Sequence, residues 1–187
     1  MIKAGQIDKG TALLIKGQPF VCIEREFVNP GKGSAFVRLK LKSPATGQVL
    51  SETMKSQDNA EDITVEDIEY QYMYKDQENY VLMSTTTFEQ TEVPVKSFPD
   101  HQYFMKEGDT YRCSVYNDEI LNIILPTKMV YVIEECEDAV KGDTVQGTTK
   151  YAKTDCGLEI KVPIFIKKGE KVRVNTETKE YLERVND

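Results

Sequence analysis

The feature that most constrains this chain is a period of two in its apolar residues, repeated in many short segments. In AFVRLKLK, residues 35–42, Val37, Leu39 and Leu41 alternate with mostly polar side chains, as in a strand with one buried face. Similar alternation, rich in Val, Ile, Tyr and Phe, occurs in FVCIEREF, IEYQYMYK, YRCSVY, EILNIIL, MVYVIEE, LEIKVPIFI and KVRV. Short strands of this kind, separated by Gly, Pro, Asn and Asp, predict an all-β fold of small barrels or sandwiches.

Helical periodicity is scarce, and two polar breaks divide the chain. The best helical candidate is VKSFPDHQYFM, where Pro99 breaks or begins a short helix. The breaks are KSQDNAEDITVED and LPTKM. We therefore expect three domains, at 1–64, 65–128 and 129–187, each of a size at which a small barrel is marginally stable.

The charge is unevenly distributed along the chain. The net charge is −7, yet residues 1–42 carry eight basic and three acidic side chains, whereas residues 65–128 carry five and twelve. Because the field near a surface depends on charge within about 10 Å, the acidity of the whole chain does not exclude RNA as a partner of the N-terminal part.

Cysteine and histidine usage argues against a metal site. The four cysteines, Cys22, Cys113, Cys136 and Cys156, form no CxxC pair, and His101 is the single histidine. No apolar run approaches the roughly 20 residues of a membrane helix. The N-terminal MIKAGQIDKG has no apolar core of a secretory signal. We expect reduced thiols, a cytoplasmic location, no membrane partner and no cofactor.

A lysine stands at the apex of an expected hairpin, in FVNPGKGSAF. Pro30 fixes φ, and Gly31 and Gly33 permit positive φ, so a tight turn would project Lys32. A catalytic lysine needs desolvation or a neighbouring cation, and an exposed apex supplies neither. GxSxG, P-loop and HExxH motifs are also missing. An enzyme is disfavoured, while a solvated turn residue and a phosphate contact both remain open.

Two further stretches are suited to nucleic acid. Arg38, Lys40 and Lys42 alternate on one strand face with Phe36 and could follow phosphates; a solvated sheet face fits that pattern equally well. The stretch VKGDTVQGTTKYAKTDCG, from 140 to 157, is rich in Gly, Thr and Lys. Its amides, hydroxyls and lysines suit RNA backbone contacts, although a plain surface loop is an equal alternative.

These stretches resemble bacterial elongation factor P over essentially the whole chain. The resemblance rests on NPGKGSAFVRLKLK after PFVCIEREF, on YMYKDQENYVLMSTTTFEQ, and on KGDTVQGTTKYAKTDCGLEIKVPIFIKKGEKVRVNTETKEYLERV. In the last of these, seven residues fall at the spacing of the family's C-terminal signature: Lys150, Ala152, Gly157, Val162, Pro163, Gly169 and Glu170.

The resemblance implies an SH3-like (KOW-like) N-terminal barrel and two OB-fold barrels in an L-shaped, tRNA-like arrangement. It implies a monomeric, non-enzymatic translation factor that binds both ribosomal subunits, peptidyl-tRNA and ribosomal RNA. Such factors bind between the peptidyl-tRNA and exit sites and relieve stalling at consecutive prolines.

The resemblance also implies roles for single residues. Lys32, in a loop shaped by Pro30, Gly31 and Gly33, would reach toward the peptidyl-transferase centre and could be extended by a lysine-modifying enzyme. Further residues would contact the ribosome: Gly142, Asp143 and Thr144 near the exit-site codon, and Tyr181 and Arg184 at the small subunit. The sequence pattern itself, rather than the resemblance, makes Arg38, Lys40, Lys42 and Lys150 candidates for RNA backbone contacts.

The chain departs from the family pattern in one loop. Thr148 stands where a second glycine is common, and Tyr151 stands where proline is common. These changes are compatible with a divergent lineage or a paralogue. The alternatives are a non-ribosomal RNA-binding module and, more distantly, a lysine-dependent enzyme. The related hypusine-bearing factor is disfavoured because it has two domains.

Overall fold

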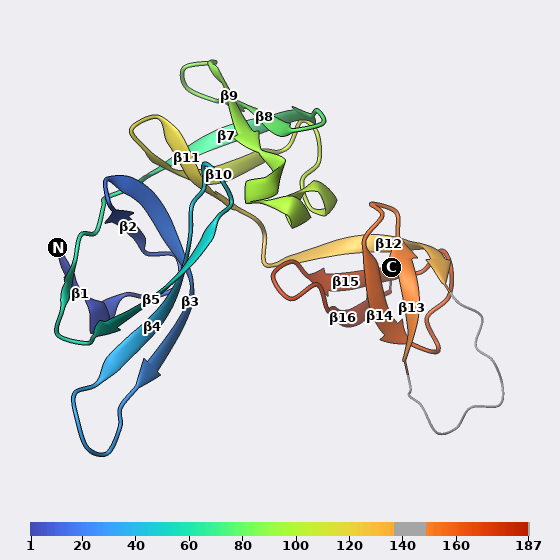
Figure 1. Ribbon diagram of the computed structural model, residues 1–187. Coiled ribbons are helices and arrows are strands. Elements are labelled where there is room, and N and C mark those ends of the chain that lie inside the picture. The colour runs from blue at the N-terminus through green and yellow to red at the C-terminus, as the bar shows by residue number, and fades with distance from the viewer. Residues whose placement is uncertain (137–148, 187) are drawn as a thin grey trace. The chain divides into compact units, whose positions relative to one another are not determined.

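The computed structural model describes residues 1–136 and 149–186. The described residues form an all-β protein with three curled sheets and three short 3-10 helices (Figure 1), which confirms the predicted fold class. The chain divides into two compact units. The first contains Met1–Gln102 and Lys106–Ile124, and the second contains Tyr103–Met105 and Leu125–Asp187.

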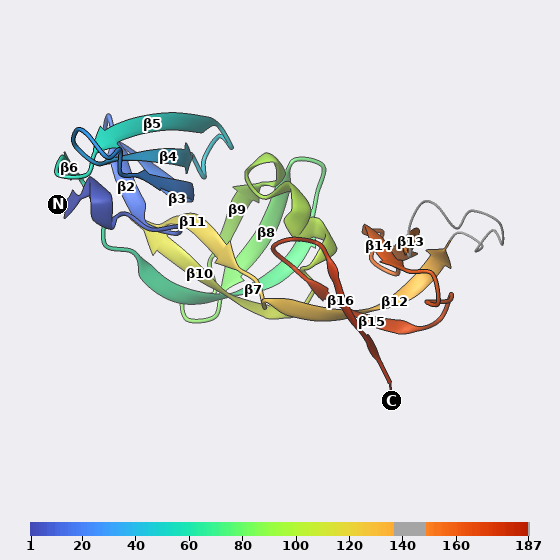
Figure 2. The same cartoon turned by 90° about the horizontal axis from the view of Figure 1, so that it is seen from below.

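The N-terminal part of the first unit is a four-stranded antiparallel sheet in the order β2-β3-β4-β5. Its strands are β2 (Ala12–Ile15), β3 (Gln18–Val28), β4 (Phe36–Lys42) and β5 (Val49–Lys55). A small ribbon pairs β1 (Ile2–Lys3) with β6 (Asn59–Ala60), and the 3-10 helix η1 (Ala4–Gln6) follows β1. In Figures 1 and 2, β4 lies between β3 and β5.

The alternation predicted for residues 36–42 is confirmed. Val37, Leu39 and Leu41 are fully buried in the core of this sheet, together with Leu13 and Phe20. The side chains between them on β4 remain exposed or half-buried. Since burial of an aliphatic side chain stabilises a fold by about 1.5–3 kcal/mol, these three residues fix which face of β4 points inward.

The second part of the first unit is a five-stranded sheet in the order β11-β10-β7-β8-β9. Its strands are β7 (Glu66–Lys75), β8 (Asn79–Ser84), β9 (Gln90–Pro94), β10 (Thr110–Tyr116) and β11 (Glu119–Ile124). The helices η2 (Val95–Ser97) and η3 (Pro99–Tyr103) occupy the segment predicted to be helical, and Pro99 begins η3. The Tyr80 hydroxyl donates a hydrogen bond of 2.8 Å to the Phe98 carbonyl, which ties this segment to β8.

Within the first unit, the loop between β4 and β5 packs against η2. The buried Ser97 hydroxyl donates a hydrogen bond to the Pro44 carbonyl. The Lys42 ammonium lies 5.7 Å from the centre of the Phe98 ring. These contacts connect β4 and the loop after it to the segment that follows β9, so the orientation of β4 is coupled to the middle sheet through this segment.

The second unit is built on β12, the central strand of a five-stranded sheet in the order β14-β13-β12-β15-β16. The strands are β12 (Lys128–Cys136), β13 (Thr149–Thr154), β14 (Glu159–Pro163), β15 (Lys171–Asn175) and β16 (Tyr181–Val185). Their buried side chains pack around Phe104 and Tyr131, whose rings lie 6.3 Å apart. The strands of the three large sheets lie within residues 12–55, 66–124 and 128–185.

Candidate functional site

The strands β3 and β4 form a long hairpin that projects from the N-terminal sheet (Figure 1). The last cross-strand pair is Val28 with Phe36, so residues 29–35 form the loop. Gly33 has a φ of +116°, which disfavours a side chain, whereas Gly31 does not have a positive φ. A Cβ atom added at Gly33 would meet only the Pro30 ring, at 3.8 Å. The turn is therefore set by backbone conformation rather than by packing.

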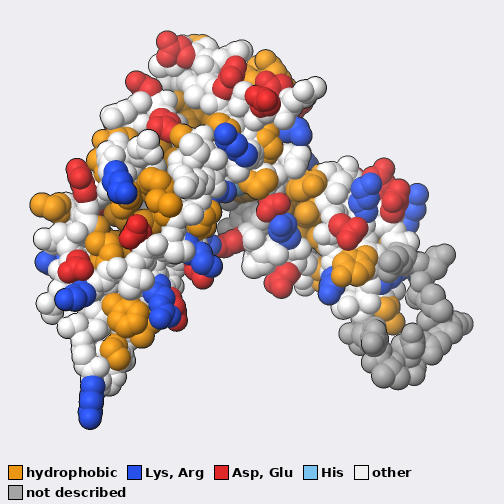
Figure 3. All heavy atoms as spheres, in the orientation of Figure 1, with side chains coloured by type: hydrophobic (Ala, Val, Ile, Leu, Met, Phe, Trp, Pro, Cys, Tyr) orange, Lys and Arg blue, Asp and Glu red, His pale blue; other side chains and the backbone are white. Residues whose placement is uncertain are grey.

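Lys32 lies in this loop and is exposed. Among the residues that the structure describes, its side chain makes no hydrogen bond and no ion pair. In the space-filling view, the hairpin ends in a basic side chain that extends past the rest of the N-terminal sheet (Figure 3). An ammonium in this position keeps three donors available to an external partner.

The predicted basic stripe contains two cross-strand ion pairs. Lys40 lies 2.6 Å from a Glu24 carboxylate oxygen, and Arg38 lies 3.1 Å from a Glu26 oxygen. The register places Glu24 opposite Lys40 and Glu26 opposite Arg38. Both pairs are solvent-exposed, so each contributes about 0–1 kcal/mol and weakens with salt. This hairpin face is consequently a charge-balanced ladder rather than a continuous cationic track.

Lys42, the third residue of the stripe, has a different environment. Its side chain is half-buried, with the ammonium over the Phe98 ring. Burial lowers the pKa of Lys42, and the nearby Asp100 carboxylate acts in the opposite direction. Lys42 therefore takes part in packing within the first unit.

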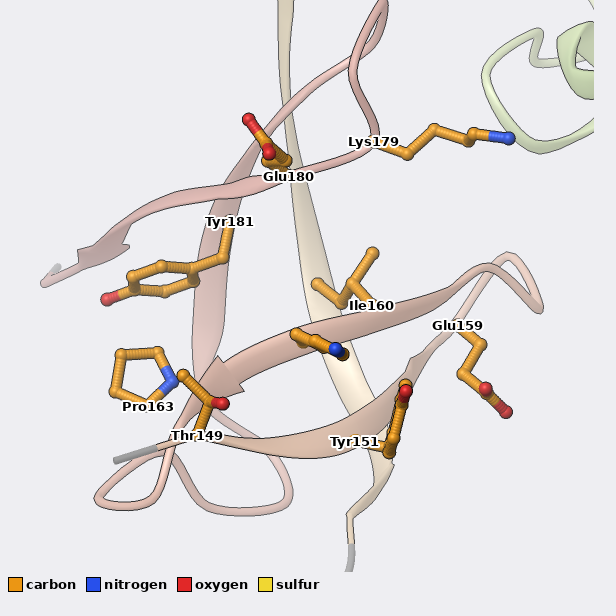
Figure 4. A pocket seen from close by; sticks show the side chains of 9 residues that line it. Thr149, Tyr151, Glu159, Ile160, Pro163, Lys179, Glu180 and Tyr181 are labelled. Carbon is orange, nitrogen blue, oxygen red and sulfur yellow. The ribbon is translucent and has the colours of Figure 1, made fainter. Parts of the chain in front are cut away.

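The predicted RNA-contacting residues of the last third occupy separate positions in the second unit. Gly142, Asp143 and Thr144 lie outside the described residues. The Lys150 ammonium donates to the Cys136 sulfur at 3.6 Å, and Arg184 pairs with Glu170 at 3.4 Å. Tyr181 is half-buried and lines a pocket with residues of β13 and β14 (Figure 4).

The sequence pattern does not predict this pocket. It has a volume of about 460 Å³ and contains two tyrosines, Tyr151 and Tyr181. The available signal was Tyr151 itself, a departure from the family pattern. The acidic partners of the basic stripe were missed as well, because their positions depend on the register of β3 against β4.

The cysteines differ in their accessibility. Cys22 and Cys113 are fully buried, whereas Cys136 and Cys156 are partly exposed. Burial, and to a smaller extent the Asp67 carboxylate, raises the pKa of Cys113 to about 12. Burial also raises the pKa of Cys22. These two thiols therefore behave as small core residues.

The chain matches three family models: the KOW-like domain of elongation factor P at residues 3–60, its OB domain at 65–123, and its C-terminal domain at 129–184. These matches confirm the predicted KOW-like and OB domains. Within the described residues, no helix has the length and apolar character needed to span a membrane.

The relatives match over their full length. Elongation factor P of Treponema denticola is 48% identical over 186 residues, covering 100% of both chains. The factor of Treponema pallidum (strain Nichols) is 49% identical over 187 residues with the same coverage. That of Borrelia hermsii is 41% identical over 189 residues, covering 100% of this chain and 98% of its own. This chain is therefore a member of the elongation factor P family of translation elongation factors.

Proposed function

We propose that this protein binds the ribosome between the peptidyl-tRNA and exit sites and stimulates peptide-bond formation at consecutive prolines. The proposal rests on the environment of the Lys32 side chain. This side chain is exposed at the end of a long two-stranded hairpin and has no partner among the described residues. A cation presented in this way is best explained by a partner that lies on another molecule.

The proposed mechanism is positioning rather than bond chemistry. Proline is a conformationally restricted substrate for peptide transfer. A factor that holds the end of peptidyl-tRNA in a reactive geometry lowers the barrier by reducing the orientational entropy lost in the reaction. The Lys32 ammonium has three donors for tRNA backbone oxygens.

The strands of the hairpin support this role. Seven cross-strand residue pairs join β3 to β4, from Val21–Lys42 to Val28–Phe36, and β4 is also paired with β5 along its length. Paired strands are stiffer than an isolated loop, so the position of the tip is determined by the sheet. An extension of Lys32 by a modifying enzyme would lengthen the reach of the same group without changing this support.

The direct test is ribosome-dependent synthesis of a peptide that contains a Pro-Pro-Pro stretch. We expect Lys32→Ala to lose most of the stimulation. The matched control is Lys55→Ala, because Lys55 is an exposed lysine of the same sheet, opposite Phe36. Full stimulation by the Lys32→Ala protein would overturn the role of this residue. Failure of the wild-type protein to co-sediment with ribosomes would instead favour an RNA-binding module outside the ribosome.

A second comparison separates charge from modification. Lys32→Arg keeps the positive charge but removes the primary amine. If an attached group is required, Lys32→Arg will lose stimulation as Lys32→Ala does, and protein from its native host will be heavier than its sequence. A mass equal to the bare sequence would exclude the modification while leaving the ribosomal function intact.

A further inference from the structure

The second unit contains a concave site at the seam of its curled sheet. The two edge strands of the sheet, β14 and β16, approach each other there. The pocket between them has a volume of about 460 Å³, and Ile160 lies between the two tyrosines, Tyr151 and Tyr181, in Figure 4. The other lining residues are Thr149, Glu159, Lys161, Pro163, Lys179 and Glu180.

The aromatic side chains of this site are available to a ligand. Tyr151 is 47% exposed, although it stands in the middle of strand β13. Tyr181 is half-buried and lies on the other side of the pocket, near Pro163 and Thr149 (Figure 4). Neither tyrosine hydroxyl has a hydrogen-bond partner among the described residues. Both rings therefore combine an apolar surface with a polar group that has no internal partner.

A cation lies beside Tyr151 without a carboxylate partner. Lys161 is directly opposite Tyr151 across the β13–β14 ladder, and its ammonium lies 5.4 Å from the centre of the ring. Lys161 makes no ion pair with any carboxylate in the described part of the chain, whereas Arg173 and Arg184 of the same unit pair with Glu183 and Glu170. The site thus combines an exposed aromatic ring with a lysine that makes no ion pair with the carboxylates of the pocket, Glu159 and Glu180.

We propose that this pocket binds one unpaired nucleotide of RNA, with its base stacked on Tyr151 and its phosphate near Lys161. Aromatic rings together with lysines are the usual means of holding single-stranded nucleic acid, since every base has a face that can stack. The volume is large enough for a base and its sugar. The Glu159 and Glu180 carboxylates can only accept hydrogen bonds when ionised, so they can pair only with N–H groups of a base. Adenine is favoured over uracil because its larger ring system stacks more strongly on Tyr151.

The inference rests on the proposed function, which supplies RNA as the partner class, but its test requires no ribosome. Binding of the full-length protein to fluorescein-labelled single-stranded RNA hexamers is measured by anisotropy at low salt. We expect Tyr151→Ala to weaken binding at least about fivefold, the loss typical of one stacked base. Tyr151→Phe should retain the wild-type affinity, and oligo(A) should bind more tightly than oligo(U).

Two control variants make the test specific. Tyr74 has the same exposed fraction, 47%, and lies on β7 of the first unit, so Tyr74→Ala should leave RNA binding unchanged. Lys55→Ala, which removes an exposed cation of β5 in the first unit, should also leave it unchanged. Because the hexamer assay contains no ribosome, it can fail while stimulation through Lys32 succeeds, so the two proposals are tested separately.

The proposal is overturned if the wild-type protein binds no hexamer, or if Tyr151→Ala binds as tightly as the wild type. It is also overturned if Tyr74→Ala weakens binding as much as Tyr151→Ala does. Such a result would mean that exposed tyrosines bind RNA wherever they lie, and not at this pocket in particular. Equal urea-unfolding midpoints for the variants and the wild type would show that lost binding reflects the site rather than the fold.

Discussion

Gly47 lies so close to the Lys96 carbonyl that a Cβ atom added to the glycine would stand 2.7 Å from that oxygen. Gly47 belongs to the loop between β4 and β5, and Lys96 belongs to η2, so the contact joins the two sheets of the first unit. The oxygen is a backbone atom, which a side-chain rotation cannot move away. This position therefore requires glycine for two reasons, its φ of +72° and the absence of space.

Gly47→Ala is expected to destabilise the first unit beyond the cost of its backbone conformation. The conformation alone costs about 1–2 kcal/mol for a residue with a Cβ atom, and the overlap with Lys96 adds a further ~1–3 kcal/mol. Gly17→Ala is the control, because Gly17 has a φ of +79° with nothing within 4 Å of an added Cβ. Urea unfolding of the two variants measures the difference, and equal losses of stability would contradict the importance of the contact.

The stability of the protein should decrease as the pH falls below about 6.5, the ordinary pKa of histidine. Burial, assisted by the nearby Lys42 ammonium, lowers the pKa of His101, while its hydrogen bond with the Ile123 carbonyl and the Asp100 carboxylate act in the opposite direction. The unfolded chain therefore binds the proton at a higher pH than the folded protein. The stabilisation by neutral His101 is complete above pH 6.5 and is lost toward the folded pKa.

His101→Gln isolates this effect because His101 is the single histidine. We expect the free energy of unfolding of the wild type to fall between pH 7 and pH 5.5, with a slope of up to about 1.4 kcal/mol per pH unit. The variant should show a flatter dependence over the same interval. Parallel curves for the two proteins in denaturant titrations would assign the pH dependence to carboxylates instead.

The charge ladder on the hairpin should limit nonspecific binding of RNA. Changing Glu24 and Glu26 together to glutamine releases Lys40 and Arg38 from their ion pairs. We expect tighter binding of single-stranded RNA, with the slope of log K against log salt steeper by about 0.7 for each released cation. Glu52→Gln is the control, since Glu52 is exposed but lies opposite Leu39. An unchanged salt slope would show that neither cation was restrained by its partner.

The four thiols should react in two groups with a maleimide at neutral pH. Cys136 and Cys156 are partly exposed and should be labelled first in the native protein. Cys113, whose pKa is raised to about 12, and Cys22 should be labelled only as the protein opens. Peptide mapping after a short reaction distinguishes the groups, and early labelling of Cys113 would mean that the middle sheet opens readily.

The sequence was most informative where one residue determines its own surroundings. The alternation at Val37, Leu39 and Leu41 predicts a half-buried strand because strand geometry sends successive side chains to opposite faces. The exposed position of Lys32 follows in the same way from Pro30 and Gly33. A helix boundary at Pro99 was also predicted, since proline either breaks a helix or begins one, and the structure shows that it begins η3.

The sequence does not predict contacts that depend on how two distant segments pair. Whether Glu24 meets Lys40 is decided by a bulge between Cys22 and Glu24, where the register of β3 against β4 shifts by one residue. No property of either strand alone reveals that shift. The hydrogen bond of His101 in η3 likewise depends on the Ile123 carbonyl of β11, and the pocket at Tyr151 depends on the approach of β14 and β16.

The same register has a consequence for how far the hairpin can extend. Inserting one residue in β3 alone would turn Glu24 and Glu26 away from their basic partners. Inserting two residues in each strand would preserve every facing pair while moving the loop outward by about 7 Å. The hairpin can therefore lengthen only in steps of two residues per strand. Any finer change in how far it reaches must come from the side chain of Lys32 or from a group attached to it.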